Sequence, residues 1–390
     1  MGAIYDPRYR AVIQKLVALR NEAGLTQREL ADRLDGFRQP DIAKVEGLQR
    51  RLDVIELVDW LTALGAADVT FPNLGSISTV SGVSESAASY TLESEFVQVP
   101  GSSRSVATGV SVTLANRDTE HTVVFENASL GEYAKVEVEV ARLIRSLNDP
   151  KSRLKNRDAV ARALDLAIRS LPQVNPSDLY RHLVYRHYIR EFKKAQASQS
   201  WVRAGGEGLE LFIEGWYRDR LAADGIEIKA LLGKSAKREA LEEMGIADRI
   251  GDSKLDLVLY GLAEDRRVLF GGIHSKASLA ERVADDVPCS RAMMAEGFMS
   301  VLWTFDAKDY PPRDMTNRGE LGSPESPTTK RELIERDEAF DAAFVYNTRA
   351  IPSEAGTEHP VIVSSLEPKR DALPAYISKR WQEFAASMPK

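Results

Sequence analysis

The chain has 390 residues, enough for roughly two or three domains. Hydrophobic residues make up 43% and charged residues 28%, a balance typical of globular proteins. No apolar run is long enough to span a bilayer, and the N-terminus lacks the pattern of a secretory signal, so we expect no membrane partner and a cytoplasmic location. A single cysteine, Cys289, excludes an internal disulfide and a thiolate zinc cluster.

The net charge of −6 argues against loose coating of nucleic acid, but the charge is segregated along the chain. Residues 68–139 contain 10 acids and 3 Lys or Arg residues, whereas residues 151–200 contain 11 Lys or Arg residues and 4 acids. Because nucleic acid responds to the local field, the global value leaves room for a focused binding site.

The N-terminal segment, residues 1–68, predicts an all-α domain, because apolar residues recur at three- and four-residue spacing. Within it, Leu25–Glu46 has the pattern of two short helices joined by a turn. Thr26 is a favourable N-cap, and Glu29 three residues later completes a capping box. Pro40 suits the first turn of the second helix, where its missing N–H costs nothing.

This pattern resembles the Cro/C1-type helix-turn-helix of phage repressors, over roughly residues 8–66. The resemblance implies that Gln27 contacts a DNA phosphate and that Gln39, at the start of the recognition helix, reads a base. A helix N-terminus favours phosphate, and glutamine can pair bidentately with adenine. Arg38 and Lys44 would hold the DNA backbone. Two alternatives are a generic helical hairpin and a helix-turn-helix used only for dimerisation.

Residues 69–198 predict a β-rich and then helical middle region. The Ser-, Gly- and Thr-rich composition of residues 71–89 indicates a linker or the edge of a new domain. Residues 90–140 alternate polar and apolar side chains, as in Val136–Val140, and predict strands. Residues 150–195 return to a helical pattern that prolines interrupt.

Farther along the chain, two apolar strands are predicted at residues 255–260 and 268–276, and they carry Asp256 and Lys276. An aspartate inside a buried strand costs free energy unless it is paired or binds a metal. A turn at residues 263–267 would join the strands as a hairpin and bring the two side chains together if they share a face. Phosphodiester hydrolysis needs Mg²⁺ on hard oxygen ligands and a cation near the developing charge, which these residue types can supply. The alternative is a structural salt bridge.

The arrangement resembles the PD-(D/E)XK nuclease superfamily, whose core has the order α-β-β-β-α-β. The stretch from His274 to Pro288 is more specific and is similar to type II restriction endonucleases of the BsaWI kind, in the group that reads CCGG-like sites. The resemblance implies an α/β nuclease domain with a mixed central sheet over residues 199–390. Its expected elements are a helix at 203–220, strands at 255–260 and 268–276, a helix at 278–286 and a strand at 300–304.

The sequence departs from the superfamily pattern at His274, which replaces the usual acid two residues before the lysine. In the CCGG-reading group a glutamate of the following helix substitutes, which makes Glu281 a candidate catalytic residue and metal ligand. The same helix also reads bases in that group, so Glu281 could instead accept from cytosine while Arg282 contacts guanine. Asp285 and Asp286 are further candidates, and Asp286 could instead be a solvated acid before Pro288. Glu210 is the candidate that the first core helix would present to the metal, or else a surface acid.

We therefore predict a multi-domain bacterial or phage type II restriction endonuclease that hydrolyses double-stranded DNA with Mg²⁺, at a CCGG-like palindrome. Asp256, Lys276, Glu281 and Glu210 would be catalytic, with the three acids as metal ligands. A homodimer is expected because a palindrome matches a two-fold protein. One alternative is a helix-turn-helix transcription regulator with a non-catalytic sensor or dimerisation domain. Another is a nuclease that reads modified or damaged DNA through residues 70–195.

Overall fold

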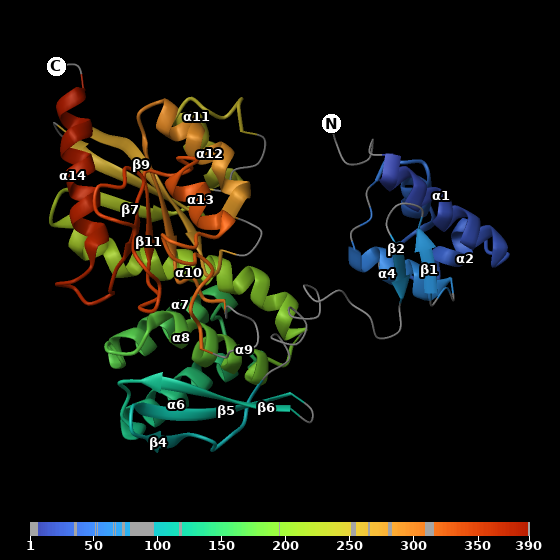
Figure 1. The fold of residues 1–390 in the computed structure, drawn as a ribbon, viewed down its shortest axis with the longest axis horizontal. Helices are drawn as coiled ribbons and strands as arrows, with labels where there is room; N and C mark the ends of the chain where they lie inside the picture. Colours follow the sequence, from blue (N-terminus) through green and yellow to red (C-terminus); the bar gives the residue numbers. More distant parts are fainter. Residues whose placement is uncertain are drawn as a thin grey trace. The chain divides into compact units, whose positions relative to one another are not determined.

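The computed structural model of the chain consists of two compact units, one within Met1–Glu93 and the other within Ser94–Lys390 (Figure 1). Each unit has its own hydrophobic core. Across the described ranges, no helix combines the length and apolar character needed to cross a membrane. The structure describes residues 7–34, 37–50, 52, 54–64, 66, 68–71, 75–78, 97–116, 119–194, 196–250, 255–263, 266–279, 283–308 and 316–388.

Helices and a short hairpin make up the first unit. Buried side chains of Leu16, Leu30, Ile42 and Trp60 contribute to its core. The antiparallel hairpin begins at residue 68 and extends into the segment 71–89, where we had expected a linker or the edge of a new domain. Its strands were not predicted, because Ser and Gly separate their few apolar residues. The elements are α1 (Pro7–Glu22), α2 (Gln27–Ala31), α3 (Gln39–Glu46), α4 (Val54–Ala63), β1 (Asp68–Phe71) and β2 (Gly75–Ser78).

The start of α2 is capped as predicted. The Thr26 hydroxyl accepts a hydrogen bond from the Glu29 backbone N–H at 3.2 Å, and the Glu29 carboxylate accepts one from the Thr26 backbone N–H at 2.8 Å. The capping box is thereby confirmed. Pro40 lies in the first turn of α3, also as predicted. Helix α2 ends at Ala31, earlier than the apolar pattern indicated.

The second unit begins with a four-stranded antiparallel sheet whose central strand pairs with the other three. Our prediction of a strand at Val136–Val140 is wrong, because these residues lie in a helix. Val136 and Val140 are one helical turn apart and buried, whereas Val138 is 62% exposed on the opposite face, so a two-residue alternation hid a helical pattern. The elements are β3 (Val97–Gln98), β4 (Arg104–Val106), β5 (Gly109–Asn116), β6 (Thr119–Glu126) and α6 (Leu130–Ser146).

The helical segment that follows is interrupted near Pro176, as predicted, and its middle turn is a π-helix. The last and longest helix, α10, packs along α7. Gly208 of α10 permits this close approach, since a Cβ there would lie 2.7 Å from the Val160 Cβ and 3.0 Å from the Arg157 carbonyl oxygen. The helices are α7 (Asn156–Ser170), α8 (Pro176–Asp178), η2 (Leu179–Tyr185), α9 (Arg186–Glu191) and α10 (Ala197–Ala222).

A six-stranded sheet forms the centre of the second unit, in the order β12-β11-β10-β9-β8-β7. Strands β7, β8 and β9 are antiparallel neighbours, whereas β9, β10, β11 and β12 run parallel, which confirms the predicted mixed sheet. The strands are β7 (Ile226–Ala230), β8 (Leu257–Ala263), β9 (Arg266–Lys276), β10 (Met299–Thr304), β11 (Ala342–Val345) and β12 (Val361–Val363).

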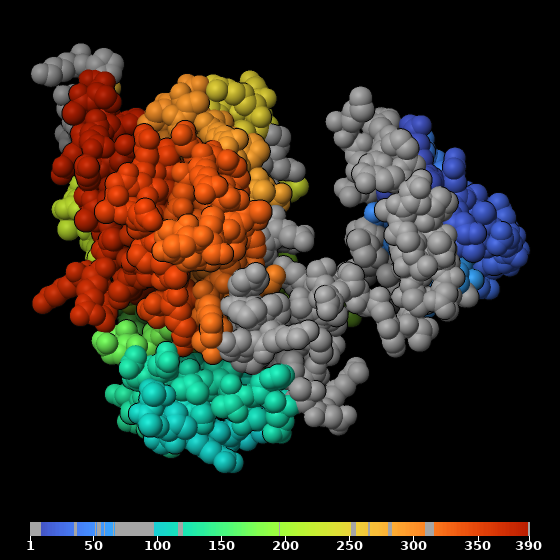
Figure 2. All heavy atoms as spheres, viewed as in Figure 1, coloured from blue at the N-terminus to red at the C-terminus, as the bar shows by residue number. Residues whose placement is uncertain are grey.

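Helices cover both faces of this sheet. Leu257 and Leu259 of β8 point into the large core that includes α7 and α10, whereas Val258 and Tyr260 point into a second core against the opposite helices. Figure 2 shows the segments from the small sheet to the C-terminal helix as a continuous body of packed atoms. The remaining helices are α11 (Lys234–Glu243), α12 (Val283–Ala295), α13 (Thr329–Glu335) and α14 (Ala372–Ser387).

Two parts of the expected core order need correction. The expected core order did not include β7 and α11, which lie between α10 and β8 in the chain. The helix expected at 278–286 is instead α12, Val283–Ala295, and it continues past Pro288. Pro288 lies inside this helix, where it removes one backbone hydrogen bond and crowds the preceding turn, so the helix was expected to end before it.

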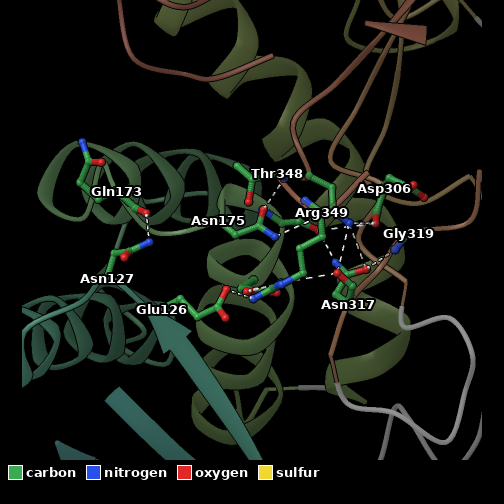
Figure 3. A network of polar contacts seen from close by, with 12 residues as sticks. Glu126, Asn127, Gln173, Asn175, Asp306, Asn317, Gly319, Thr348 and Arg349 are labelled. Atoms are coloured by element: carbon green, nitrogen blue, oxygen red, sulfur yellow. Dashed lines mark hydrogen bonds and ion pairs between the residues drawn. The ribbon is translucent and has the colours of Figure 1, made fainter. Parts of the chain in front are cut away.

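Arg349 ties the small sheet and the helical segment to the large sheet. It follows β11 and donates hydrogen bonds to Asp178 of α8 at 2.8 Å and to Glu126 of β6 at 2.9 Å (Figure 3). Asn175 extends the same network by donating to the Asn347 side chain at 2.9 Å. The domain boundary expected between residues 198 and 199 thus falls inside one compact unit with a continuous core.

Candidate active site

Asp256 and Lys276 meet at one end of the β8–β9 hairpin. The register places Leu257 opposite Ile273, so the residue before β8 lies beside the end of β9. The Ser275 backbone N–H donates to Asp256 Oδ2 at 2.8 Å, and Lys276 Nζ lies 3.3 Å from the same oxygen. The structure therefore brings together the pair that the sequence analysis singled out.

Asp286 of α12 is a second partner of this lysine. Lys276 Nζ lies 2.6 Å from Asp286 Oδ2, and the Asp286 side chain is almost completely buried. The interpretation of Asp286 as a solvated acid is wrong, because the N-terminal part of α12 faces the end of β9 and the Asp286 side chain is buried there. His274, where the usual acid is missing, is also buried, with Nδ1 4.0 Å from Asp286 Oδ2. Glu281 and Arg282 lie outside the described residues.

Glu210 reaches the same cluster from α10, and its exposed fraction is only 8%. The interpretation of Glu210 as a surface acid is therefore wrong. Lys237 of α11 lies beside it, with its Nζ 2.7 Å from Asp256 Oδ1 and 3.8 Å from Glu210 Oε1. Five ionisable side chains thus converge, four from α10, α11, β9 and α12 and one from the residue before β8: Glu210, Lys237, Lys276, Asp286 and Asp256.

Lys237 is the member of this cluster that the sequence analysis missed. A signal was present, because Lys237 shares a helix face with Ala240 and Leu241, which are both buried. A lysine within the apolar face of a helix is rarely buried unless an acid pairs with it. The signal could be used only if a helix had been predicted over residues 234–243, and the expected core order included no helix there.

Burial and charge set distinct protonation states in the cluster. Burial, followed by the negative charge of Asp256, raises the pKa of Glu210 to about 8. Burial opposes ionisation of Asp256, but the Lys276 and Lys237 ammonium groups lower its pKa to about 2. Burial also opposes the charge of Lys276, yet the two neighbouring aspartates raise its pKa above the usual value. Asp256 is therefore anionic and Lys276 cationic near neutral pH.

The first unit brings Gln27 and Gln39 into contact. Gln39 Nε2 donates to Gln27 Oε1 at 2.9 Å, and Gln27 Nε2 donates to Glu46 Oε2 at 2.8 Å. Arg20 completes the chain of contacts, with Nε 2.6 Å from Glu46 Oε1. Gln39, Arg38 and Lys44 are exposed on α3 or immediately before it. The sequence analysis chose these residues separately and missed the network that orients the glutamines.

Comparisons with known proteins agree with this geometry. A family model described as BsaWI restriction endonuclease type 2 matches residues 234–369, which include Asp256, Lys276 and Asp286. The chain is 43% identical over 265 residues to the type II restriction enzyme AgeI of Thalassovita gelatinovora, a match that covers 65% of this chain and 93% of that enzyme.

Two solved structures are similar as well. The crystal structure of the specific restriction endonuclease AgeI–DNA complex matches with a TM-score of 0.65 and 40% identity, covering 69% of this chain and 99% of the AgeI chain. The pre-specific BsaWI–DNA complex gives a TM-score of 0.33 and 16% identity, covering 66% of this chain and 96% of that chain.

The similarity to AgeI in sequence and in structure defines the chain as a nuclease. The chain belongs to the type II restriction endonucleases, in the family that includes AgeI, and it is a site-specific deoxyribonuclease. Roughly a third of the chain lies outside the sequence match to AgeI.

The raised pKa of Glu210 leads to a prediction about stability. Between pH 4.5, the ordinary glutamate value, and about pH 8, the folded protein keeps a proton that the unfolded chain has released. Stability therefore falls as the pH rises through this window, and Glu210→Gln should remove that loss. In EDTA at pH 8.5, we expect the variant to be more stable than wild type by several kcal/mol, since each pKa unit corresponds to about 1.4 kcal/mol. At pH 5 the difference should largely vanish.

Urea unfolding of both proteins at the two pH values measures this effect. The control is Glu242→Gln on α11, whose side chain is 56% exposed and which should change stability by less than about 0.5 kcal/mol. A Glu210→Gln variant that is less stable than wild type at pH 8.5 would contradict the electrostatic description.

Proposed function

We propose that this restriction endonuclease uses Mg²⁺ and cuts both strands of a CCGG-like palindrome as a homodimer in the cytoplasm. Its catalytic centre would consist of Glu210, Asp256, Asp286 and Lys276. The observation that carries the assignment is the Lys276 ammonium group, which lies within 3.3 Å of both Asp256 and Asp286 at the end of β9. The resemblance of residues 274–288 to the CCGG-reading group supports the CCGG-like site.

The residues fit a divalent cation by their chemistry. Among the described residues, no three acids or histidines lie close enough to form a complete metal site. Glu210 and Asp256 would hold Mg²⁺ with their carboxylate oxygens, the hard ligands it prefers, and water would supply the rest. When bound, Mg²⁺ lowers the pKa of a coordinated water and polarises a phosphoryl oxygen. When the metal is absent, Lys237 pairs with Asp256 and the raised pKa of Glu210 keeps that acid protonated near neutral pH.

The protein's own groups would act around this metal. Lys276 places a fixed positive charge where negative charge develops on the phosphate during strand cleavage. Asp286 holds that ammonium group in position and replaces the acid missing at His274. Glu281 and Arg282 lie just before α12, and we assign them to the reading of cytosine and guanine edges, the second of the two roles considered for Glu281.

Cleavage of unmethylated phage DNA with Mg²⁺ tests this function. Wild type should give discrete fragments whose ends share one short palindrome. Lys276→Ala should reduce the single-turnover cleavage rate by at least about 10²-fold, because it removes the cation beside the reacting phosphate. An exposed lysine supplies the control, and Lys369→Ala should cut at the wild-type rate. Intact DNA with both wild type and variant, alongside tight binding to one duplex, would favour the transcription-regulator function.

The first unit would provide a second, separate DNA contact as a Cro/C1-type helix-turn-helix. The observation that favours it is the Gln39–Gln27–Glu46–Arg20 network, which holds the exposed Gln39 side chain in a defined orientation at the start of α3. Such pre-orientation suits a residue that reads a base edge, since less side-chain entropy is lost on binding. Lys44 and Arg38 would contact the backbone on either side.

Selection of bound sequences from a random duplex pool tests the helix-turn-helix, with the Lys276→Ala protein used to prevent cutting. The pool should yield a motif distinct from the cleavage site. Gln39→Ala should weaken binding to that motif about tenfold, because a bidentate base contact is worth roughly 1–3 kcal/mol. The exposed Gln49→Ala variant should leave it unchanged. Recovery of the cleavage site alone would remove the support for a second DNA-binding unit.

A further inference from the structure

A basic cavity lies beside the N-terminal half of α10, one helical turn before Glu210. Its volume is about 500 Å³. Figure 1 shows α7 alongside α10, and the cavity lies where the start of α7 meets α10. Its lining residues are Lys155, Asn156, Arg157, Gln199, Ser200, Arg203, Ala204 and Glu207. None of them takes part in the cluster around Lys276.

The cations of this cavity outnumber its acid. Arg157 Nη1 donates to Glu207 Oε2 at 2.9 Å, and Arg203 Nε donates to Glu207 Oε1 at 2.7 Å. Glu207 therefore orients two guanidinium groups, and Arg157 Nε also lies 4.0 Å from Oδ1 of Asp158, which does not line the cavity. Lys155 adds a third cation, and among the described residues its side chain forms no ion pair.

The surface around the cavity is basic as well. Lys151 and Arg153 precede Lys155 at alternate positions, and all three side chains are exposed. In the part of the chain that the structure describes, neither Lys151 nor Arg153 forms a side-chain ion pair. These residues belong to the segment 151–200, whose excess of 11 Lys or Arg residues over 4 acids has no role in the catalytic cluster. Three exposed cations of this segment thus lie within five residues of the chain that end at the cavity residue Lys155.

The position of the cavity relative to Glu210 is fixed by the helix. Glu207 and Glu210 are three residues apart on α10, which places them roughly 4.5 Å apart along the helix axis. The contact of Gly208 with Val160 keeps α7, and with it Arg157 and Lys155, against this turn. The cavity is therefore held at a short, constant distance from the proposed metal ligands.

We propose that this cavity binds a phosphate of the DNA backbone next to the scissile one. Arginine forks match the oxygen atoms of a phosphodiester, and a positively charged lining suits a phosphate better than a base. Lys155 and Arg203 contact the phosphate, and Glu207 keeps the arginines in place. This inference rests on the proposed catalytic centre, because that centre fixes where the cleaved strand lies.

The salt dependence of DNA binding tests the inference. The double variant Lys155→Gln/Arg203→Gln removes two exposed charges and should fold like wild type, as circular dichroism will show. In EDTA, where no strand is cut, we measure its Kd for a duplex carrying the mapped cleavage site at several salt concentrations. We expect at least about fivefold weaker binding at low salt and a slope of log K against log salt that is smaller by about 1–2.

The matched control is Arg336→Gln/Lys379→Gln, which removes two charges whose side chains are 68% and 74% exposed elsewhere on the same unit. Its slope should equal that of wild type. The weakening by Lys155→Gln/Arg203→Gln should be equal for cognate and unrelated duplexes, since a phosphate carries no sequence information. An unchanged slope, or weakening confined to the cognate duplex, overturns the proposal.

The two proposals fail separately. Loss of cleavage in Lys276→Ala together with an unchanged slope in Lys155→Gln/Arg203→Gln overturns the phosphate cavity and leaves the catalytic centre standing. Full cleavage by Lys276→Ala overturns the proposed centre, and with it the placement of the scissile phosphate beside the cavity.

Discussion

The second unit depends on a buried ammonium group held between two buried carboxylates. Lys276 ends β9, Asp256 precedes β8 and Asp286 lies in α12. The cluster therefore fixes the ends of two inner strands and a covering helix to each other. Removing one partner of such a cluster leaves an uncompensated charge, which typically costs about 3–5 kcal/mol. Glu210 and Lys237 bring the cluster to three acids and two lysines. The raised pKa of Glu210 keeps this acid protonated near neutral pH, so it adds no negative charge while no metal is bound. A divalent cation would favour release of that proton, which would connect the stability of the fold to its function.

Much of the nuclease fold could be predicted from the sequence wherever hydrophobic residues recur at a clear helical or strand spacing. The hairpin of β8 and β9, the strand β10 and the long helix α10 follow from apolar runs and helical spacing. The Val-Glu alternation at Val136–Val140 misled the analysis, because buried positions four residues apart satisfy both a strand and a helix pattern. The continuity of the middle region with the large sheet could not be predicted, since it depends on long-range contacts such as Arg349 with Asp178 and Glu126.

The candidate site was predictable in part. Asp256 and Lys276 could be identified because charged residues at the ends of apolar strands need a partner, and their mutual contact follows from the hairpin register. Asp286 could not be preferred over its neighbours, because the choice depends on where α12 begins and which way its first turns face. The position of Lys237 could not be predicted, because it depends on β7 and α11, which the expected core order did not include.

The central claim is that Asp286 supplies the acid that holds Lys276 for catalysis. Single-turnover cleavage by Asp286→Asn and Glu281→Gln, each at saturating Mg²⁺ on a duplex with the mapped site, tests it most directly. We predict that Asp286→Asn cleaves at least about 10²-fold more slowly with its affinity for that duplex preserved, because the ammonium group loses its anchor. Glu281→Gln should mainly lose discrimination between related sites. A fully active Asp286→Asn together with an inactive Glu281→Gln would contradict the account.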